Sequence, residues 1–296
     1  MKKSVYLLLA VSAVLLGSVV ASAQTQPQLP KVLWIYREDG KPARGAAHQK
    51  VEHGLAQYWA KNKVQPFLAM EAVSGNATEV MFLSGYDSLA SMEKDYQAFG
   101  KAASGAEYEA LERQEAELVN GVRSMVAILR PDLSYHPERL MGVLPHCRYF
   151  NIETFRVRLG KDEEFGATGK MFQNAFEKLK QEQPYVFYQV LMGAPEGTYL
   201  LFSPLKSFKE VDDDFANQKA FMEAFGEENM KALTKATGDV ILTMESNIYA
   251  FNPMMSNVSK EFAAGDTKFW APKPVAKKAP APKKEGAKPA MEGKTQ

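Results

Sequence analysis

The feature that most constrains the fold of this chain is the order of strand and helix patterns between Arg148 and Phe251. Apolar and polar side chains alternate over residues 149–157, which is typical of a half-buried strand. Large apolar residues then recur at helical spacing. The predicted elements are a strand at 149–157, a helix around 165–179, strands at 185–192 and 198–202, a helix at 207–235 and a strand at 240–251. This β-α-β-β-α-β order predicts a ferredoxin-like unit.

Four short blocks indicate that the same unit occurs twice. Each block in the first half has a counterpart 118 to 122 residues later. The pairs are residues 35–37 with 154–156, 65–67 with 183–185, 81–84 with 200–203, and 124–131 with 246–253. Their constant order and nearly constant offset favour tandem repeats. The alternative is a pair of unrelated α+β domains with similar strand edges.

Helix boundaries can be predicted at a few positions. The second helix of the first half should cover residues 88–120, with a break near Ser104-Gly105. In the second half, Ser207 and Glu210 have the spacing of a capping box, which predicts a helix start there.

Composition changes divide the chain further. The predicted segments are a signal peptide (1–23), a leader (24–31), the first repeat (32–131), a linker (132–147), the second repeat (148–253), a C-terminal extension (254–270) and a tail rich in Lys, Pro and Ala (271–296). Neither the leader nor the tail has an apolar pattern with which to dock, so both should be separable from the fold.

The N-terminus has the pattern of an export signal. Lys2 and Lys3 precede an apolar run over residues 5–20, and Ala21-Ser22-Ala23 forms a cleavage site. The protein should therefore be periplasmic or extracellular, with no transmembrane segment after cleavage. Cys147 is the single cysteine, so no disulfide can form within one chain.

Charge argues against nucleic acid as a partner. The 36 basic and 35 acidic residues nearly cancel, and several of the basic ones lie in the signal and the tail. The tail should be disordered and solvated. The alternative is a weak electrostatic contact between the tail and an anionic cell envelope.

A tandem pair of β-α-β-β-α-β units of this length resembles the dimeric α+β barrel superfamily, over residues 32–253. That group includes antibiotic-biosynthesis monooxygenases, stress-responsive barrels, NIPSNAP-type proteins and chlorite-dismutase-type haem proteins. The resemblance implies an α+β fold in which the two repeats pair their sheets as a pseudo-dimeric barrel with helices outside. It rests on topology and matches no signature motif, so no activity follows from it.

Residues for chemistry are sparse, and no catalytic residue, metal site or cofactor is predicted. The candidate pocket lies between the first helix and the sheet of the first repeat, and consists of His48, Glu52, Trp59, Trp34, Tyr36 and Tyr58. In such a pocket, with few other polar groups, burial should lower the pKa of His48. A haem would use His48 or His53 as its axial ligand. An ordinary helix histidine and aromatic residues of the core are the alternatives.

Two functions remain open from the sequence. The first is a non-catalytic exported barrel that binds an apolar small molecule or a protein partner. The absence of paired catalytic residues favours it. The alternative is a cofactor-free monooxygenase or a haem-dependent oxidoreductase, which the resemblance implies.

Overall fold

Strands and helices follow one order in both halves of the computed structural model, which describes residues 28–271. The first half contains β1 (Val32–Gly40), α1 (Gly45–Lys61), β2 (Phe67–Ala72), β3 (Glu79–Tyr86), α2 (Leu89–Ala102), α3 (Ala106–Ala116) and β4 (Val119–Leu129). The second contains β5 (Tyr149–Val157), α5 (Asp162–Leu179), β6 (Val186–Met192), β7 (Thr198–Leu205), α6 (Lys209–Ala216), α7 (Gln218–Phe225), α8 (Glu227–Val240) and β8 (Ile241–Phe251). A short helix α4 (Leu140–Val143) lies in the linker, and α9 (Lys260–Ala264) and α10 (Thr267–Trp270) follow β8.

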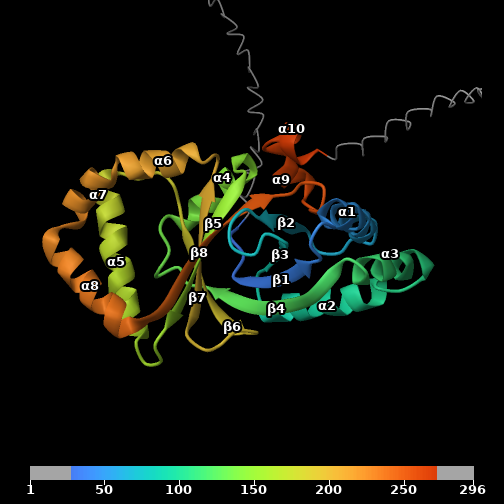
Figure 1. Cartoon of the computed structure of the whole chain (residues 1–296), viewed down its shortest axis with the longest axis horizontal. Coiled ribbons are helices and arrows are strands. Elements are labelled where there is room, and N and C mark those ends of the chain that lie inside the picture. The colour runs from blue at the N-terminus through green and yellow to red at the C-terminus, as the bar shows by residue number, and fades with distance from the viewer. Residues whose placement is uncertain (1–27, 272–296) are drawn as a thin grey trace, which may run out of the picture.

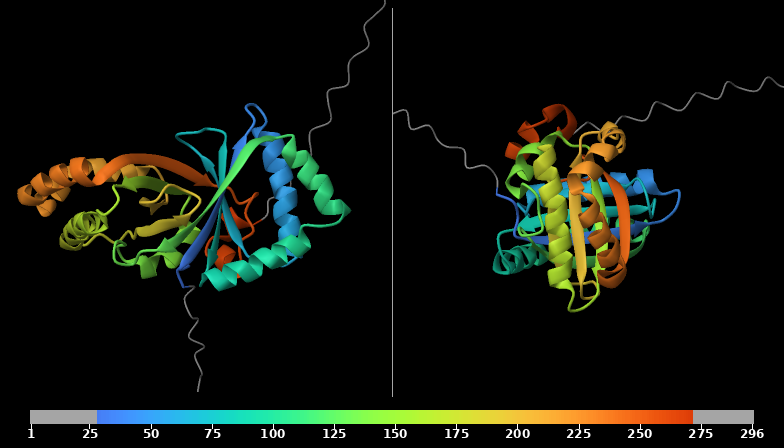
Figure 2. Two further views of the ribbon diagram at one scale, coloured as in Figure 1. Left: turned by 90° about the horizontal axis from the view of Figure 1, so that it is seen from below. Right: turned by 90° about the vertical axis from the view of Figure 1, so that its left-hand side faces the viewer.

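The eight strands close into one antiparallel barrel in the order β1-β3-β2-β8-β5-β7-β6-β4 (Figure 1). Two seams join the halves: β2 pairs with β8, and β4 pairs with β6. The predicted closed barrel is therefore confirmed. Closure leaves the helices on the outside, and Figure 2 shows those of the two halves on opposite flanks.

Alternation along each strand divides its side chains between two environments. On β1, Leu33 and Ile35 point into the barrel and belong to the largest apolar cluster, together with residues of all the other strands. Trp34 and Tyr36 lie on the opposite face, toward the helices. The outward face of β1 therefore forms the floor of a second layer, between the sheet and α1, α2 and α3.

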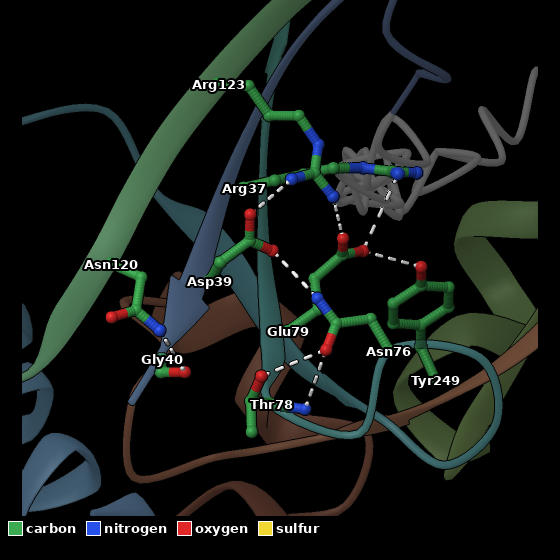
Figure 3. A network of polar contacts seen from close by, with 9 residues as sticks. All are labelled: Arg37, Asp39, Gly40, Asn76, Thr78, Glu79, Asn120, Arg123 and Tyr249. Carbon is green, nitrogen blue, oxygen red and sulfur yellow. Dashed lines mark hydrogen bonds and ion pairs between the residues drawn. The ribbon is translucent and has the colours of Figure 1, made fainter. Parts of the chain in front are cut away.

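A polar network ties the two halves together at one end of the barrel (Figure 3). Glu79 is only 3% exposed and is the centre of this network. Tyr249 of the second half donates a hydrogen bond to Glu79 across 2.7 Å. Arg37 and Arg123 form ion pairs with the same carboxylate, and Arg123 also pairs with Asp39. Paired in this way, the carboxylate can remain charged although it is buried.

The segments that flank the barrel strands pack against its other end. Trp270 of α10 is buried there and donates a hydrogen bond to the carbonyl of Pro145 across 2.8 Å. Leu29 packs against the same apolar cluster, and the Tyr188 hydroxyl donates to the carbonyl of Pro30. The end of the leader is thus docked, because Leu29 supplies an apolar contact that the mainly polar composition of this segment concealed.

The predicted signal peptide and most of the predicted tail lie outside the described residues. Within residues 28–271, no helix combines the length and the apolar character that a membrane crossing requires.

Candidate functional site

Four ionisable side chains meet in the layer between the sheet and the helices of the first half. Glu38 comes from β1, on the same face as Trp34 and Tyr36. His48 and Glu52 come from α1, where a spacing of four places them on one face. Glu115 comes from the last turn of α3. One donor atom from each of the four lies within 4.8 Å of the donor atoms of the others. We call these four residues the carboxylate–histidine cluster.

Three members of the cluster are buried, Glu115 is half-buried, and the histidine is shared between two carboxyl groups. His48 is 3% exposed, and Glu38 and Glu52 are each 5% exposed. The Nε2 atom of His48 lies 2.9 Å from Glu38 Oε2 and 2.9 Å from Glu115 Oε1. Glu52 Oε1 and Glu115 Oε2 are buried and have no hydrogen-bond partner among the described residues. Three carboxyl groups thus surround one imidazole, and these two oxygens lack a partner unless one carboxyl group is protonated and donates to its neighbour.

Burial and mutual repulsion shift the titration of these groups. Burial raises the pKa of Glu38, although His48 opposes the shift. Burial also raises the pKa of Glu52 far above its usual range, and the charges of Glu38 and Glu115 add to it. Burial alone lowers the pKa of His48, but hydrogen bonds to Glu115 and Glu38 outweigh it and raise that pKa from 6.5 to about 9. In the protein without further ligands, the cluster therefore holds protons at neutral pH.

The six predicted pocket residues divide into two groups. Glu52, His48 and Tyr36 form the first group, at the carboxylate–histidine cluster. Burial raises the pKa of Tyr36, and the nearby charges of Glu38 and Glu52 raise it further. The others pack as core. The ring of Trp34 lies 6.4 Å from that of Tyr36, Trp59 lies 4.4 Å from Phe99, and the Tyr58 hydroxyl donates to the carbonyl of Ala102.

The surroundings predicted for His48 are wrong in one respect. His48 faces the sheet, but three carboxyl groups surround it, so its pKa rises where a fall was expected. Sequence reasoning missed Glu38 and Glu115. Glu38 did give a signal, because it continues the helix-facing positions of Trp34 and Tyr36 with a charged residue. Glu115 is 67 residues from His48 and gave none.

Two cavities differ in their relation to the cluster. A cavity of about 190 Å³ is lined by His48 together with Gly40, Lys41, Glu71 and Thr78. A larger one, of about 450 Å³, opens at the far end of the barrel between apolar side chains and has no histidine in its lining. Only the smaller one adjoins the cluster, and it has space for dioxygen, peroxide or a molecule of about the size of phenol.

Comparison with solved structures places this architecture among known folds. An anthrone oxidase-like protein superposes with a TM-score of 0.50 at 16% identity, over 77% of this chain and 94% of its own. The chain has the dimeric α+β barrel fold. A protein from Lactobacillus acidophilus NCFM with the provisional name monooxygenase gives a TM-score of 0.45 at 6% identity, over 76% of this chain and 94% of its own. A mutant chlorite dismutase from Candidatus Nitrospira defluvii gives 0.46 at 9% identity, over 79% and 96%. No family model and no curated protein matches the sequence.

These comparisons correct the first functional reading of the sequence. A non-catalytic dimeric α+β barrel was expected, yet the solved structure that superposes with a TM-score of 0.50 bears the name of an anthrone oxidase-like protein. This finding overturns the expectation of a purely binding protein. At these identities the likeness itself establishes the fold, so the chemistry has to come from the residues.

Haem, which some dimeric α+β barrels bind, does not fit the two candidate axial ligands, His48 and His53. Nε2 of His48 is already engaged by two carboxylates. Nδ1 of His53 is bonded to the carbonyl of Met254, and its Nε2 is bonded to Gln57. The cavity beside His48 is far smaller than a porphyrin, and the larger cavity contains no histidine. Neither His48 nor His53 is therefore available as an axial ligand of haem.

At the position that Glu38 has in the first half, the second half of the barrel packs apolar side chains. Its β5 occupies the position that β1 has in the first half. Phe155 and Val157 of β5 pack there against Phe165 of α5 and Val240 of α8, in a cluster of apolar and aromatic residues. Val157 is 1% exposed. An apolar seal is therefore sufficient for this fold, and the carboxylate–histidine cluster is an addition that the architecture does not require.

Proposed function

We propose that this protein is an oxidoreductase and that the carboxylate–histidine cluster is its catalytic centre. The observation that carries the proposal is the burial of Glu38, His48 and Glu52 in a layer that the second half fills with apolar side chains. Buried ionisable groups lower stability unless they are fully paired. A cluster with two unsatisfied carboxylate oxygens is more typical of a functional site than of a structural one.

The arrangement suits reactions that move protons together with electrons. The pKa of Glu52 is well above its usual range, and that of His48 is about 9, so the imidazole holds a proton near neutral pH. His48 also lines the small cavity, so it is placed to exchange a proton with a molecule bound there. The half-buried phenol of Tyr36 lies close enough for the charges of Glu38 and Glu52 to raise its pKa.

The experiment is an oxygen-electrode assay on the purified protein. Anthrone and simple phenols are tested as substrates whose oxidation consumes oxygen, and chlorite is tested as a compound whose breakdown releases oxygen. Anthrone and chlorite are chosen because structures with this fold are named anthrone oxidase-like protein and chlorite dismutase. Activity with any of them, lost in Glu52→Gln, supports the proposal. The matched control is Glu153→Gln, which removes a carboxylate of the second half whose pKa burial also raises. If Glu52→Gln retains as much activity as Glu153→Gln, the cluster is not the catalytic centre.

We also propose that the two halves are tandem repeats that pair as a pseudo-dimer. The shared β-α-β-β-α-β order, with the second helix divided into two helices in the first half and three in the second, and the four matched sequence blocks support this. Export is proposed as well, on the strength of the basic start, apolar run and cleavage site in residues 1–23. Sequencing the N-terminus of the protein from its native host tests export, because the mature chain should begin at Gln24.

A further inference from the structure

We infer that the carboxylate–histidine cluster is a site for one divalent manganese or iron ion, with four protein ligands: Glu38, His48, Glu52 and Glu115. The inference rests on the proposed function, because it names the ion at the same centre. Four independent properties of the cluster support it, namely its spacing, its unsatisfied oxygens, its charge and the chemistry of its donor atoms.

The spacing matches the edges of a coordination octahedron. Ligand atoms ~2.1 Å from a common ion lie ~3 Å apart when they are neighbours and ~4.2 Å apart when they are opposite. Nε2 of His48 is 2.9 Å from one oxygen of Glu38 and 2.9 Å from one oxygen of Glu115. All four donor atoms lie within 4.8 Å of one another, close to the full span of such a site.

The unsatisfied oxygens indicate a ligand that the protein atoms do not supply. Glu52 is 5% exposed, and its Oε1 atom has no hydrogen-bond partner within residues 28–271. Glu115 Oε2 is also buried and has no hydrogen-bond partner within these residues. Buried carboxylate oxygens without partners are rare, because each loses its bonds to water on folding. A bound cation would give these carboxylates the interaction that they lack.

The charge of the cluster is unbalanced in the described structure. Three carboxyl groups face a single imidazole, and no lysine or arginine forms an ion pair with any of the three. A divalent ion would balance the excess negative charge of the three carboxylates.

The donor atoms favour manganese or iron over other ions. Carboxylate oxygens suit hard cations such as Mg²⁺ and Mn²⁺, whereas imidazole is typical of first-row transition metals. One imidazole with three carboxyl groups combines both preferences. Of the four ligands, His48 lines the small cavity, which places space for a small co-substrate beside the site.

The test uses Mn²⁺ alone as the probe, added to protein that has been stripped with a chelator. We expect saturable binding of one ion per chain, measured as loss of the sharp electron paramagnetic resonance signal of aqueous Mn²⁺. Binding should raise the midpoint of thermal unfolding, because the ion binds only the folded chain. Glu52→Gln and His48→Gln should each weaken the affinity at least ~10-fold.

Two controls separate a metal site from a structural role. His53→Gln alters a histidine on the same helix that lies outside the cluster, and should leave Mn²⁺ affinity unchanged. Stripped Glu52→Gln should be folded and at least as stable as the stripped wild type, because it no longer buries an ionisable carboxyl group. It should nevertheless gain no stability from Mn²⁺, whereas a structural glutamate would lose stability on substitution.

The outcomes distinguish this inference from the proposed function. No saturable binding, or binding that Glu52→Gln and His48→Gln leave intact, overturns the metal site. If stripped protein still oxidises its substrate and Glu52→Gln abolishes that activity, the metal inference fails while the oxidoreductase stands. If Mn²⁺ binds as expected but no oxidation is detected, the metal site stands and the proposed function fails.

Discussion

At the scale of single residues, the proton on His48 stabilises the cluster in addition to packing. His48 sits between two carboxylates, and its imidazolium form satisfies both of them at once. Deprotonation removes the positive charge and leaves the acidic groups facing one another across a buried space. The state of one side chain therefore controls the electrostatic balance of β1, α1 and α3.

This arrangement makes the stability of metal-free protein depend on pH. The pKa of His48 rises from 6.5 to about 9 on folding, so its contribution is complete below pH 6.5 and is lost as the pH rises through 9. Glu52, whose pKa is also raised, acts in the same direction. We expect the free energy of unfolding to fall over this range by up to ~1.4 kcal/mol per pH unit for each proton.

Urea denaturation of stripped protein at several pH values measures this effect. His48→Gln should flatten the dependence between pH 6.5 and 9, whereas His53→Gln should retain it. Stability that stays constant or increases over that interval in the wild type would show that His48 is not held as the imidazolium. Saturating Mn²⁺ should also flatten the curve, because the ion replaces the protons.

The sequence revealed half of this site. The spacing of four between His48 and Glu52 is visible along one helix, and it placed both in the candidate pocket. Glu115 comes from a different helix, 67 residues from His48, and no local pattern joins residues so far apart. Glu38 lies ten residues from His48 on β1, and its charge at a helix-facing position was the signal that was missed. The direction of the pKa shift on His48 depends on these partners, so it could not be predicted without them.

At the scale of elements, helix boundaries depend on backbone details that spacing describes incompletely. The predicted break near Ser104-Gly105 is confirmed, because Gly105 has a φ of 93° and separates α2 from α3. The predicted helix at 207–235 is instead three helices. Gly226 has a φ of 86° between α7 and α8, a conformation that glycine adopts without strain. Both breaks lie at a glycine with positive φ, but only the one at Gly105 was predicted from the sequence.

Capping shows a similar contrast, and it supplies a matched pair of substitutions. Ser88 caps α2 in a capping box, because its hydroxyl accepts from the Ser91 N–H while the Ser91 hydroxyl accepts from the Ser88 N–H. The Ser207 pattern forms no such box, since the N-cap of α6 is Phe208, and Glu210 accepts from the Lys206 N–H. Ser88→Ala should therefore destabilise the protein by ~1 kcal/mol.

Ser207→Ala is the control and should change the free energy of unfolding by less than ~0.5 kcal/mol, as an ordinary surface substitution does. Both values come from chemical denaturation of the two variants beside the wild type. A larger loss from Ser207→Ala than from Ser88→Ala would mean that the predicted capping box forms in solution after all.

At the scale of the whole molecule, closure of the barrel couples the two halves. The seams between β2 and β8 and between β4 and β6 are backbone pairings, and Tyr249 adds a side-chain bond from the second half to Glu79 of the first. The interior cluster draws residues from both halves. We therefore expect calorimetry to show one cooperative transition and not two.

Tyr249→Phe tests the side-chain link between the halves. It removes the 2.7 Å hydrogen bond to a buried carboxylate and should destabilise the protein by about 1.5–3 kcal/mol, as expected for a bond to a charged group. Tyr96→Phe is the control, because Tyr96 is 61% exposed. If both variants unfold at the same denaturant concentration, Glu79 is satisfied by Arg37 and Arg123 alone.

The packing of Leu29 and Trp270 into one apolar cluster means that the described chain enters and leaves the barrel at the same end. The cavity there is lined by residues from both segments, including Leu29 and Phe262. A protein joined directly to residue 28 or to residue 271 would therefore be held beside this cavity, and the end with the Glu79 network would remain clear.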